Sequence, residues 1–215
     1  EVGDYAFYGF ELVSCALPNS VTSIGEGAFY RVGVETVALP GVAEIGAGAF
    51  AHNKLTSLLL PAGFNAPIPE WAFVDNALTS LSLPAGIQDI GARAFQDNHL
   101  TSLSLPSVTS IGRAAFANNQ LTSLDLPVVQ DIRSGAFSWA SMDLFLVAPD
   151  TLVSIYPDAV PSIYSSDCSV RYISEAVRNS DEHQALLAAG HNYDDNIFCQ
   201  TFANAAAALA STSDG

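Results

Sequence analysis

Charged residues are scarce in this sequence, and basic residues are the scarcest. Asp, Glu, Lys and Arg make up 13% of the 215 residues, with only 7 Lys and Arg against 22 Asp and Glu. The resulting net charge of -15 repels nucleic-acid phosphates and anionic membrane surfaces, so we expect neither as a partner. Since charges are few, the surface must consist largely of Ser, Thr, Asn and Gln.

Long apolar runs and catalytic motifs are missing as well. The longest purely apolar run, residues 205–210, is too short to cross a bilayer, so no membrane insertion is expected. The chain holds no Gly-x-Ser-x-Gly, phosphate-binding loop, paired-cysteine or His-Glu-x-x-His motif. Without a nucleophile, base and orienting group, we expect neither an enzyme nor a cofactor.

Cysteine is rare, with three residues in the chain. Cys15 occupies a leucine position of the pattern described below and is expected to be a buried apolar thiol. Cys168 and Cys199 lie beyond that pattern, and we hypothesise that they form a disulfide, which would fit an oxidising exterior. Two free thiols are the alternative. A metal site is disfavoured because neither has a second Cys or His at ligand spacing.

A repeat of 21 to 23 residues occupies most of the chain. Each unit contains an Ala-Phe pair, and the phenylalanines are Phe7, Phe29, Phe50, Phe73, Phe95, Phe116 and Phe137. Such a period is typical of a solenoid, in which every unit forms one coil and stacks on its neighbours. The sequence therefore predicts about seven coils over residues 1–149. Because the chain opens inside a repeat, we expect a mature or trimmed fragment that has lost any export signal.

The spacing within a unit predicts its local structure. Leucines five, eight and ten residues after the phenylalanine end at a proline, and the last two share one face of a short strand. Four units carry an asparagine three residues after the phenylalanine, which we interpret as a structural group that satisfies turn backbone. These residues are Asn53, Asn76, Asn98 and Asn119. Gly25 and Gly112 are expected to adopt backbone angles that other residues resist.

Residues 100–127, LTSLSLPSVTSIGRAAFANNQLTSLDLP, resemble the leucine-rich repeats of the BspA-like, or Treponema-type, family of bacterial and protozoan surface proteins. The resemblance covers about residues 2–149. It implies a curved solenoid, secreted or attached to the cell surface, that acts in adhesion or partner binding, and it transfers no catalytic residue. Where the family often has cysteine three residues after the phenylalanine, this chain has asparagine, or Phe10, Val32 and Ala140.

Residues 150–215 are expected to form a C-terminal capping segment with two short helices. Ser180 is a good N-cap and Gly190 a good stop for the first helix, and the second runs from about Asp195 to Ala210. The helices are interpreted as a cap on the last coil, with a docking module for a partner as the alternative.

The candidate binding surface is the concave face, where residues beside the second leucine point away from the core. Its candidate ligand-binding residues are Ser57, Thr79, Ser80, Ser82, Thr101, Ser102, Ser104, Ser123 and Asp125. The surface has almost no charge and no aromatic anchor of the kind that tight interfaces use. It is therefore either a recognition surface or simply a polar, strand-compatible one.

Other residues carry weaker signals. His52 and His99, with Asp75 and Asp97, could form a metal ladder, but we interpret them as solvated loop residues and expect no metal. Trp71 and Trp139 are expected to pack in the core or at its rim.

Three functions are compatible with these features. The preferred one is a non-catalytic binding or adhesion module outside the cell, recognising an extracellular protein or glycan through the concave face or the cap. A structural spacer that holds another domain is the alternative. Ordered-water (ice) binding by the Ser and Thr columns is disfavoured because the repeat length varies.

Overall fold

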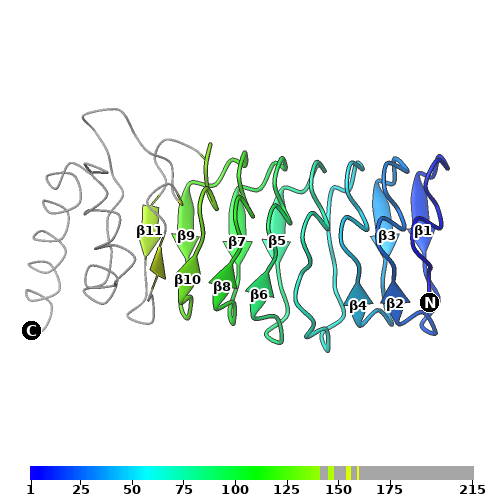
Figure 1. The fold of residues 1–215 in the computed structure, drawn as a ribbon, viewed down its shortest axis with the longest axis horizontal. Helices are drawn as coiled ribbons and strands as arrows, with labels where there is room; N and C mark the ends of the chain where they lie inside the picture. Colours follow the sequence, from blue (N-terminus) through cyan, green and yellow to red (C-terminus); the bar gives the residue numbers. More distant parts are fainter. Residues whose placement is uncertain (141–144, 148–153, 156–158, 160–215) are drawn as a thin grey trace, which may run out of the picture.

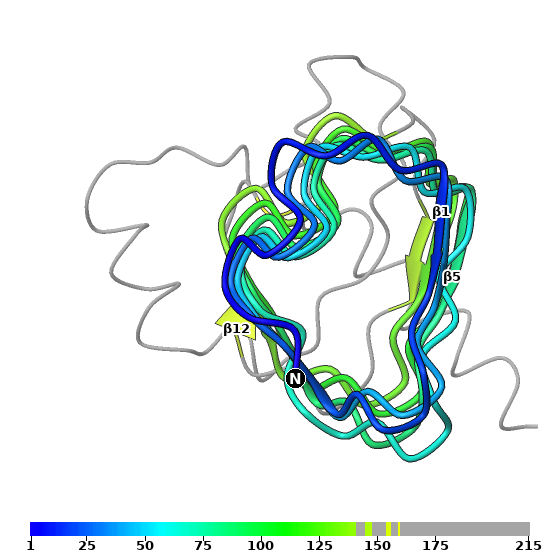
Figure 2. The ribbon, with the colours of Figure 1, turned by 90° about the vertical axis from the view of Figure 1, so that its right-hand side faces the viewer.

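The computed structural model describes residues 1–140, 145–147, 154–155 and 159. They form a parallel β-solenoid of about five turns, fewer than the seven or so coils predicted from the sequence, and these residues include no helix. Figure 1 shows the described coils stacked in a nearly straight row, and in Figure 2, viewed along the stack, they nearly overlie one another. The face predicted to be concave is therefore nearly flat. The predicted C-terminal cap, its two helices and the Cys168–Cys199 disulfide lie outside the described residues.

Most coils contribute two short strands, one of three residues and one of two. The three-residue strands are β1 (Ser14–Ala16), β3 (Thr36–Ala38), β5 (Ser80–Ser82), β7 (Ser102–Ser104), β9 (Ser123–Asp125) and β11 (Phe145–Val147). The two-residue strands are β2 (Ser23–Ile24), β4 (Glu44–Ile45), β6 (Asp89–Ile90), β8 (Ser110–Ile111), β10 (Asp131–Ile132) and β12 (Ser154–Ile155). We call the outer side of the three-residue strands the strand face.

Strands of successive coils pair in parallel register. The longest ladder runs through β6, β8, β10 and β12, and β1 pairs with β3, β5 with β7, and β9 with β11. Since β12 lies beyond residue 149, strand pairing continues past the predicted end of the repeat segment, and that boundary stays a prediction.

The coil that follows Phe50 breaks the ladder on the strand face. No strand forms over residues 57–60, although the leucine spacing predicts one there. This is the longest unit, and it includes Pro61, Pro67 and Pro69, which have no backbone N–H to donate to a neighbouring coil. A single bridge between Ile68 and Ile90 joins this coil to β6, whereas β2 and β4 form a separate pair.

The seven phenylalanines form one continuous stack in the core. Neighbouring ring centroids are 4.7 to 5.5 Å apart, with interplanar angles of 2° to 14°. All except Phe7 are fully buried, and the repeat leucines and isoleucines surround them. No coil could bury this apolar surface alone, so its hydrophobic stabilisation depends on its neighbours.

The asparagines form a column of side-chain hydrogen bonds, the asparagine ladder, that joins successive coils. These bonds confirm the structural interpretation of the four asparagines. The Oδ1 atom of Asn53 accepts hydrogen bonds from the backbone N–H of Val32, Gly33 and Val34 at 2.8 to 3.2 Å. Its Nδ2 donates to the carbonyl oxygens of Phe29 (2.7 Å) and Ala51 (3.2 Å). The asparagines of the next three coils bond in the same way, so each joins its own coil to the preceding one.

The glycine after the isoleucine is needed for a different reason from the one expected. Gly25 and Gly112 do not adopt the left-handed backbone conformation. Instead, a Cβ atom on Gly112 would lie 2.7 Å from the backbone of Gly91 and Ala92 in the preceding coil. The coils stack too closely at this point for any side chain.

Candidate functional site

The strand face presents columns of small hydroxyl side chains. The register pairs Ser80 with Ser102 and Ser82 with Ser104, and all four are exposed. Thr79, Thr101 and Ser57 are exposed as well, and the Thr101 hydroxyl donates to the carbonyl oxygen of Thr79 at 3.2 Å. The backbone of Ser123 and Asp125 belongs to β9. The structure therefore places Ser80, Ser82, Ser102 and Ser104 on one surface, and the binding role of all the predicted residues stays a prediction.

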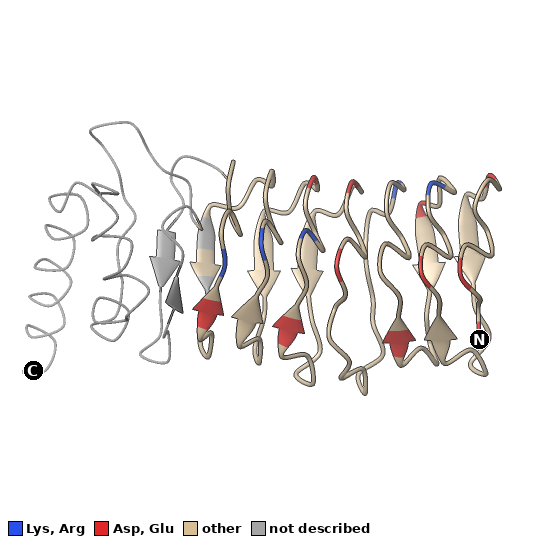
Figure 3. Cartoon of the chain, viewed as in Figure 1, with Lys and Arg blue, Asp and Glu red and all other residues tan. Residues whose placement is uncertain are grey.

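The chemistry of this surface is sparse. Strands β1, β3, β5 and β7 carry no charged residue, whereas Glu44, Asp89 and Asp131 lie on the two-residue strands (Figure 3). The strand face is also interrupted where residues 57–60 form no strand, and Leu59 there is 83% exposed. Small hydroxyls can form hydrogen bonds with a partner, but they supply little apolar contact area.

The predicted histidine and aspartate positions form isolated pairs. His52 Nδ1 lies 2.8 Å from Asp75 Oδ2, and His99 Nδ1 lies 3.4 Å from Gln120 Nε2. Asp97 accepts from Asn118 Nδ2 at 2.7 Å and from Gln96 Nε2 at 2.9 Å. Within the described part of the chain, three or more His, Cys, Asp or Glu side chains do not converge on a metal position.

A second surface follows from the turns around each phenylalanine, and we call it the turn face. The residue two positions before each phenylalanine adopts a left-handed backbone, with φ between 51° and 65°. This column consists of Tyr5, Gly27, Gly48, Trp71, Arg93, Ala114 and Gly135. The residue two positions after each phenylalanine is also left-handed, from Gly9 to Trp139. The non-glycine residues of both columns are exposed or partly exposed.

Two grooves lie on the turn face. The first, of about 490 Å³, is lined by Tyr5, Tyr8, Glu26, Gly27, Tyr30, Ala47, Gly48, Glu70 and Trp71. We call it the aromatic groove. Tyr5, Tyr8 and Trp71 are 51%, 57% and 40% exposed, and the Tyr8 and Tyr30 ring centroids are 5.9 Å apart. Its rings and carboxylates suit a ligand with both apolar and hydrogen-bonding surface.

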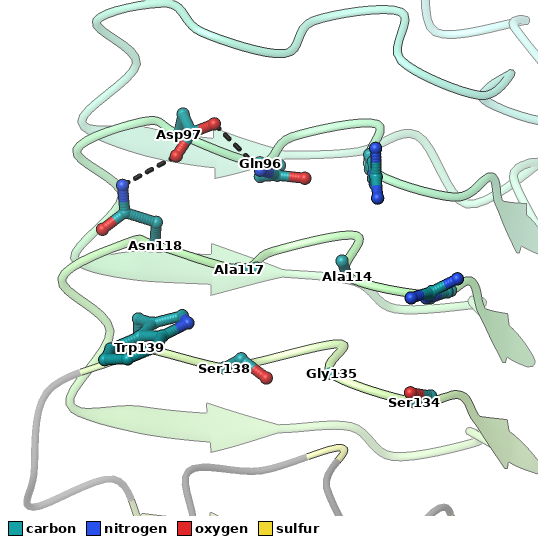
Figure 4. A pocket seen from close by; sticks show the side chains of 11 residues that line it. Gln96, Asp97, Ala114, Ala117, Asn118, Ser134, Gly135, Ser138 and Trp139 are labelled. Carbon is teal, nitrogen blue, oxygen red and sulfur yellow. Dashed lines mark hydrogen bonds between the residues drawn. The ribbon is translucent and has the colours of Figure 1, made fainter.

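The second groove, of about 480 Å³, lies farther along the stack (Figure 4). Arg93, Arg113 and Trp139 line it together with polar side chains, and Trp139 is 82% exposed. The amide oxygen of Gln96 is buried there without a hydrogen-bond partner among the described residues. The groove therefore has a basic, polar character that contrasts with the carboxylates of the aromatic groove.

A hydrogen bond links Tyr5 to Glu26, and both residues line the aromatic groove. The Tyr5 hydroxyl donates a 2.7 Å hydrogen bond to Glu26 Oε1. This bond, together with the nearby carboxylates, raises the pKa of Tyr5 above 10.0. The hydrogen bond to Glu26 thus restrains the Tyr5 side chain beside the groove.

Sequence comparison identifies the repeat. The BspA type leucine rich repeat region (6 copies) matches residues 1–122 and 66–166, which together cover more than half of the chain. The chain belongs to the BspA-type leucine-rich repeat family. This family consists of repeat proteins that are usually non-catalytic. No curated protein matches the chain.

One solved structure similar to this BspA-type repeat is a leucine rich cell surface protein from Faecalibacterium prausnitzii A2-165. Its sequence is 18% identical, with a TM-score of 0.43, and the match covers 75% of this chain and 62% of that chain. The present chain thus spans less than two thirds of that protein's length.

The aromatic groove of this BspA-type repeat was not found from the sequence. Trp71 and Trp139 lie near the core phenylalanines in the chain, which predicted core or rim packing, but both are exposed. Aligning the units on their phenylalanines would have placed Tyr5, Gly48 and Trp71 in one column. Cys15, expected to be buried, is half-buried on β1, and its burial raises the pKa of its thiol.

The described part of the chain contains no helix that is long and apolar enough to cross a membrane.

Proposed function

We propose that this chain is a non-catalytic recognition module of a secreted or cell-surface protein. The observation that carries this proposal is the continuous stack of coils, which holds exposed side chains at fixed spacing along two outer faces. Such an array provides a preorganised surface for a partner, because little conformational entropy is lost when it binds. Membership of the BspA-type family supports the extracellular setting.

The proposed contact is the strand face, with the C-terminal segment as the alternative. Ser80, Ser82, Ser102 and Ser104 form a registered, exposed block on two neighbouring strands. Their hydroxyls can donate to and accept from a protein backbone or a glycan. Because β5 and β7 carry no charged residue, these two strands would not repel a charged partner of either sign.

A binding screen with charge variants tests this proposal. The chain is screened against extracellular-matrix proteins and a glycan array, beside the double variant Ser80→Arg/Ser104→Arg. These two positions are exposed on neighbouring strands without being directly opposite, so the new charges do not face each other. The matched control, Gln88→Arg/Gln130→Arg, adds the same charge beside the two-residue strands, where both glutamines are exposed.

The outcomes separate the alternatives. A partner lost in the strand-face variant and kept in the control supports the strand face as the contact. A partner kept by both variants moves the contact to another surface. If no partner binds in either library, the recognition proposal is wrong, and a spacer that holds another domain becomes the better interpretation.

A further inference from the structure

The aromatic groove has an open slot in the column two residues before each phenylalanine. The Tyr5 ring lies over Gly27, because a Cβ atom there would collide with it. At Gly48, one coil farther along, a Cβ atom would meet no other atom within 4 Å. Trp71 follows in the next coil. The column therefore lacks a side chain between two aromatic residues.

The size of this slot suits a flat ring. From the Phe29 coil to the Phe73 coil, the core stack advances in steps of 5.0 and 5.5 Å. Two aromatic walls separated by two such steps leave room for one ring in van der Waals contact on both sides, since each contact needs about 3.5–4 Å.

Trp71 is not explained by folding. Its backbone φ is 63°, a conformation that favours glycine and is costly for a bulky side chain. Glycine occupies the same position in the two preceding coils, at Gly27 and Gly48, and Arg93 occupies it in the next coil. Because Trp71 is 40% exposed, core packing recovers only part of that cost. Bulky residues held in such conformations cluster at ligand sites.

The polar groups favour a neutral ligand that donates hydrogen bonds. Glu26 and Glu70 line the groove, and both are exposed. The Arg31 guanidinium lies 5.5 Å from the Tyr30 ring centroid, and that of Arg93 lies 5.4 Å from the Trp71 centroid. These two cations offset the two carboxylates and already occupy two of the aromatic rings. The groove thus combines apolar ring faces with two carboxylate acceptors, and the two cations lie beside its lining.

We propose that the aromatic groove binds a neutral, β-linked oligosaccharide of glucose configuration, with one sugar ring in the slot over Gly48. Such a sugar carries its substituents around the rim of the ring and exposes C–H groups on both faces. The C–H faces pack against Tyr5 and Trp71, whose ring faces are electron-rich. Rim hydroxyls donate to Glu26 and Glu70. This site lies on the turn face and is independent of the strand-face contact proposed above.

Calorimetric titration of the full 215-residue chain with cellotetraose and with chitotetraose tests the proposal. We expect saturable binding of at least one. A second readout uses the variant Trp139→Phe. The chain has 2 tryptophans, so this variant keeps Trp71 as its single tryptophan. Binding in the slot then changes the Trp71 fluorescence, whereas binding elsewhere on the stack leaves it unchanged.

Two variants remove the site without harming the fold. Trp71→Gly places glycine at a left-handed position, so the melting temperature should stay constant or rise, while affinity falls about tenfold with loss of the aromatic contact. Gly48→Asn fills the slot with a residue that tolerates this backbone, and it should also weaken binding. Ala114→Asn is the matched control. It introduces asparagine at the same position of another coil, where φ is 54°, but outside the aromatic groove.

The proposal is overturned if neither tetrasaccharide binds, or if Trp71→Gly and Gly48→Asn bind as tightly as the unmodified chain. Binding of a tetralysine peptide in place of the sugars would also overturn it and would make the groove a site for cations. A protein partner lost in the strand-face variant alone, with sugar binding kept, would show that the two proposals stand or fall separately.

Discussion

At the residue scale, four buried asparagine side chains hold the stack together. Each forms hydrogen bonds with backbone groups of its own coil and of the preceding coil. Asn98 accepts from the Leu78 N–H and donates to the carbonyl oxygens of Phe73, Phe95 and Gln96, at 3.0 to 3.2 Å. Removing the amide would leave buried backbone groups without partners, which costs more than the hydrogen bonds themselves contribute.

We expect Asn98→Ala to lower the free energy of unfolding by about 2–4 kcal/mol, because several buried groups lose their partner together. The control, Gln120→Ala, removes one exposed side-chain contact with His99 and should cost less than about 1 kcal/mol. Urea unfolding of both variants measures the difference. Equal losses would show that the buried ladder is not what holds the coils together.

The Tyr5 phenol gives a second residue-scale prediction. Its hydrogen bond to Glu26 favours the protonated form and raises the pKa of Tyr5 above 10.0. The bond is therefore fully present below pH 10 and is lost as pH rises through the raised pKa of Tyr5. We expect Glu26→Gln to shift one tyrosine titration toward lower pH in tyrosinate absorbance. Tyr5→Phe, which deletes that titration, identifies the residue.

The residue scale also shows what the sequence could predict. The asparagines stood at a fixed offset from a repeated phenylalanine, which indicated a structural role that the hydrogen bonds confirm. The exposure of Tyr5 and Trp71 was harder to predict from the sequence, because both residues lie at left-handed turn positions that hydrophobic spacing does not mark. Nothing in a run of apolar residues reveals where the backbone will take that conformation.

At the scale of the element, the glycine between a two-residue strand and its turn controls how closely the coils approach. A Cβ atom on Gly112 would lie 2.7 to 2.8 Å from three backbone atoms of the preceding coil, none of which can rotate away. The sequence pattern located this glycine correctly, but it suggested unusual backbone angles as the reason. The distance between coils is a tertiary property, so the unit alone could not reveal it.

We expect Gly112→Ala to destabilise the chain by about 1–3 kcal/mol, since it forces two coils apart. The control is Gly63→Ala, where a Cβ atom meets nothing within 4 Å and the backbone is not left-handed. That variant should be neutral or slightly stabilising. Thermal unfolding of the pair checks the prediction, and a destabilised Gly63→Ala would point to backbone freedom as the common cause.

The missing strand at residues 57–60 has an element-scale explanation too. Its leucines have the same spacing as those of the neighbouring coils, so the sequence predicted a strand. The extra length of that unit and its prolines changed the path of the backbone. Periodicity predicts which face a residue occupies, but the hydrogen bonds of a strand depend on the coil beside it.

On the scale of the whole molecule, stability is shared along the phenylalanine stack. An interior ring contacts one ring on each side, whereas Phe7 stacks on Phe29 alone and is only partly buried. Solenoids behave as chains of nearest-neighbour couplings, so the position of a defect decides its effect.

We expect Phe95→Ala to cost about 3–5 kcal/mol and to divide unfolding into two transitions, because it weakens two coil interfaces in the middle of the stack. Phe7→Ala should cost less and leave a single transition. Hydrogen exchange along the chain distinguishes these cases. Equal protection on both sides of Phe95 in the variant would mean that the coils unfold together regardless of the stack.

The asparagine ladder has a direction. Each side chain completes the turn of the coil before it, as when Asn119 accepts from the N–H of Leu100. On the ribosome, a coil therefore receives its last hydrogen bonds only after about 20 more residues have been added, a delay on the order of one to a few seconds at ordinary synthesis rates. The newest coil is always the least finished, and the nascent solenoid matures one unit behind its own synthesis.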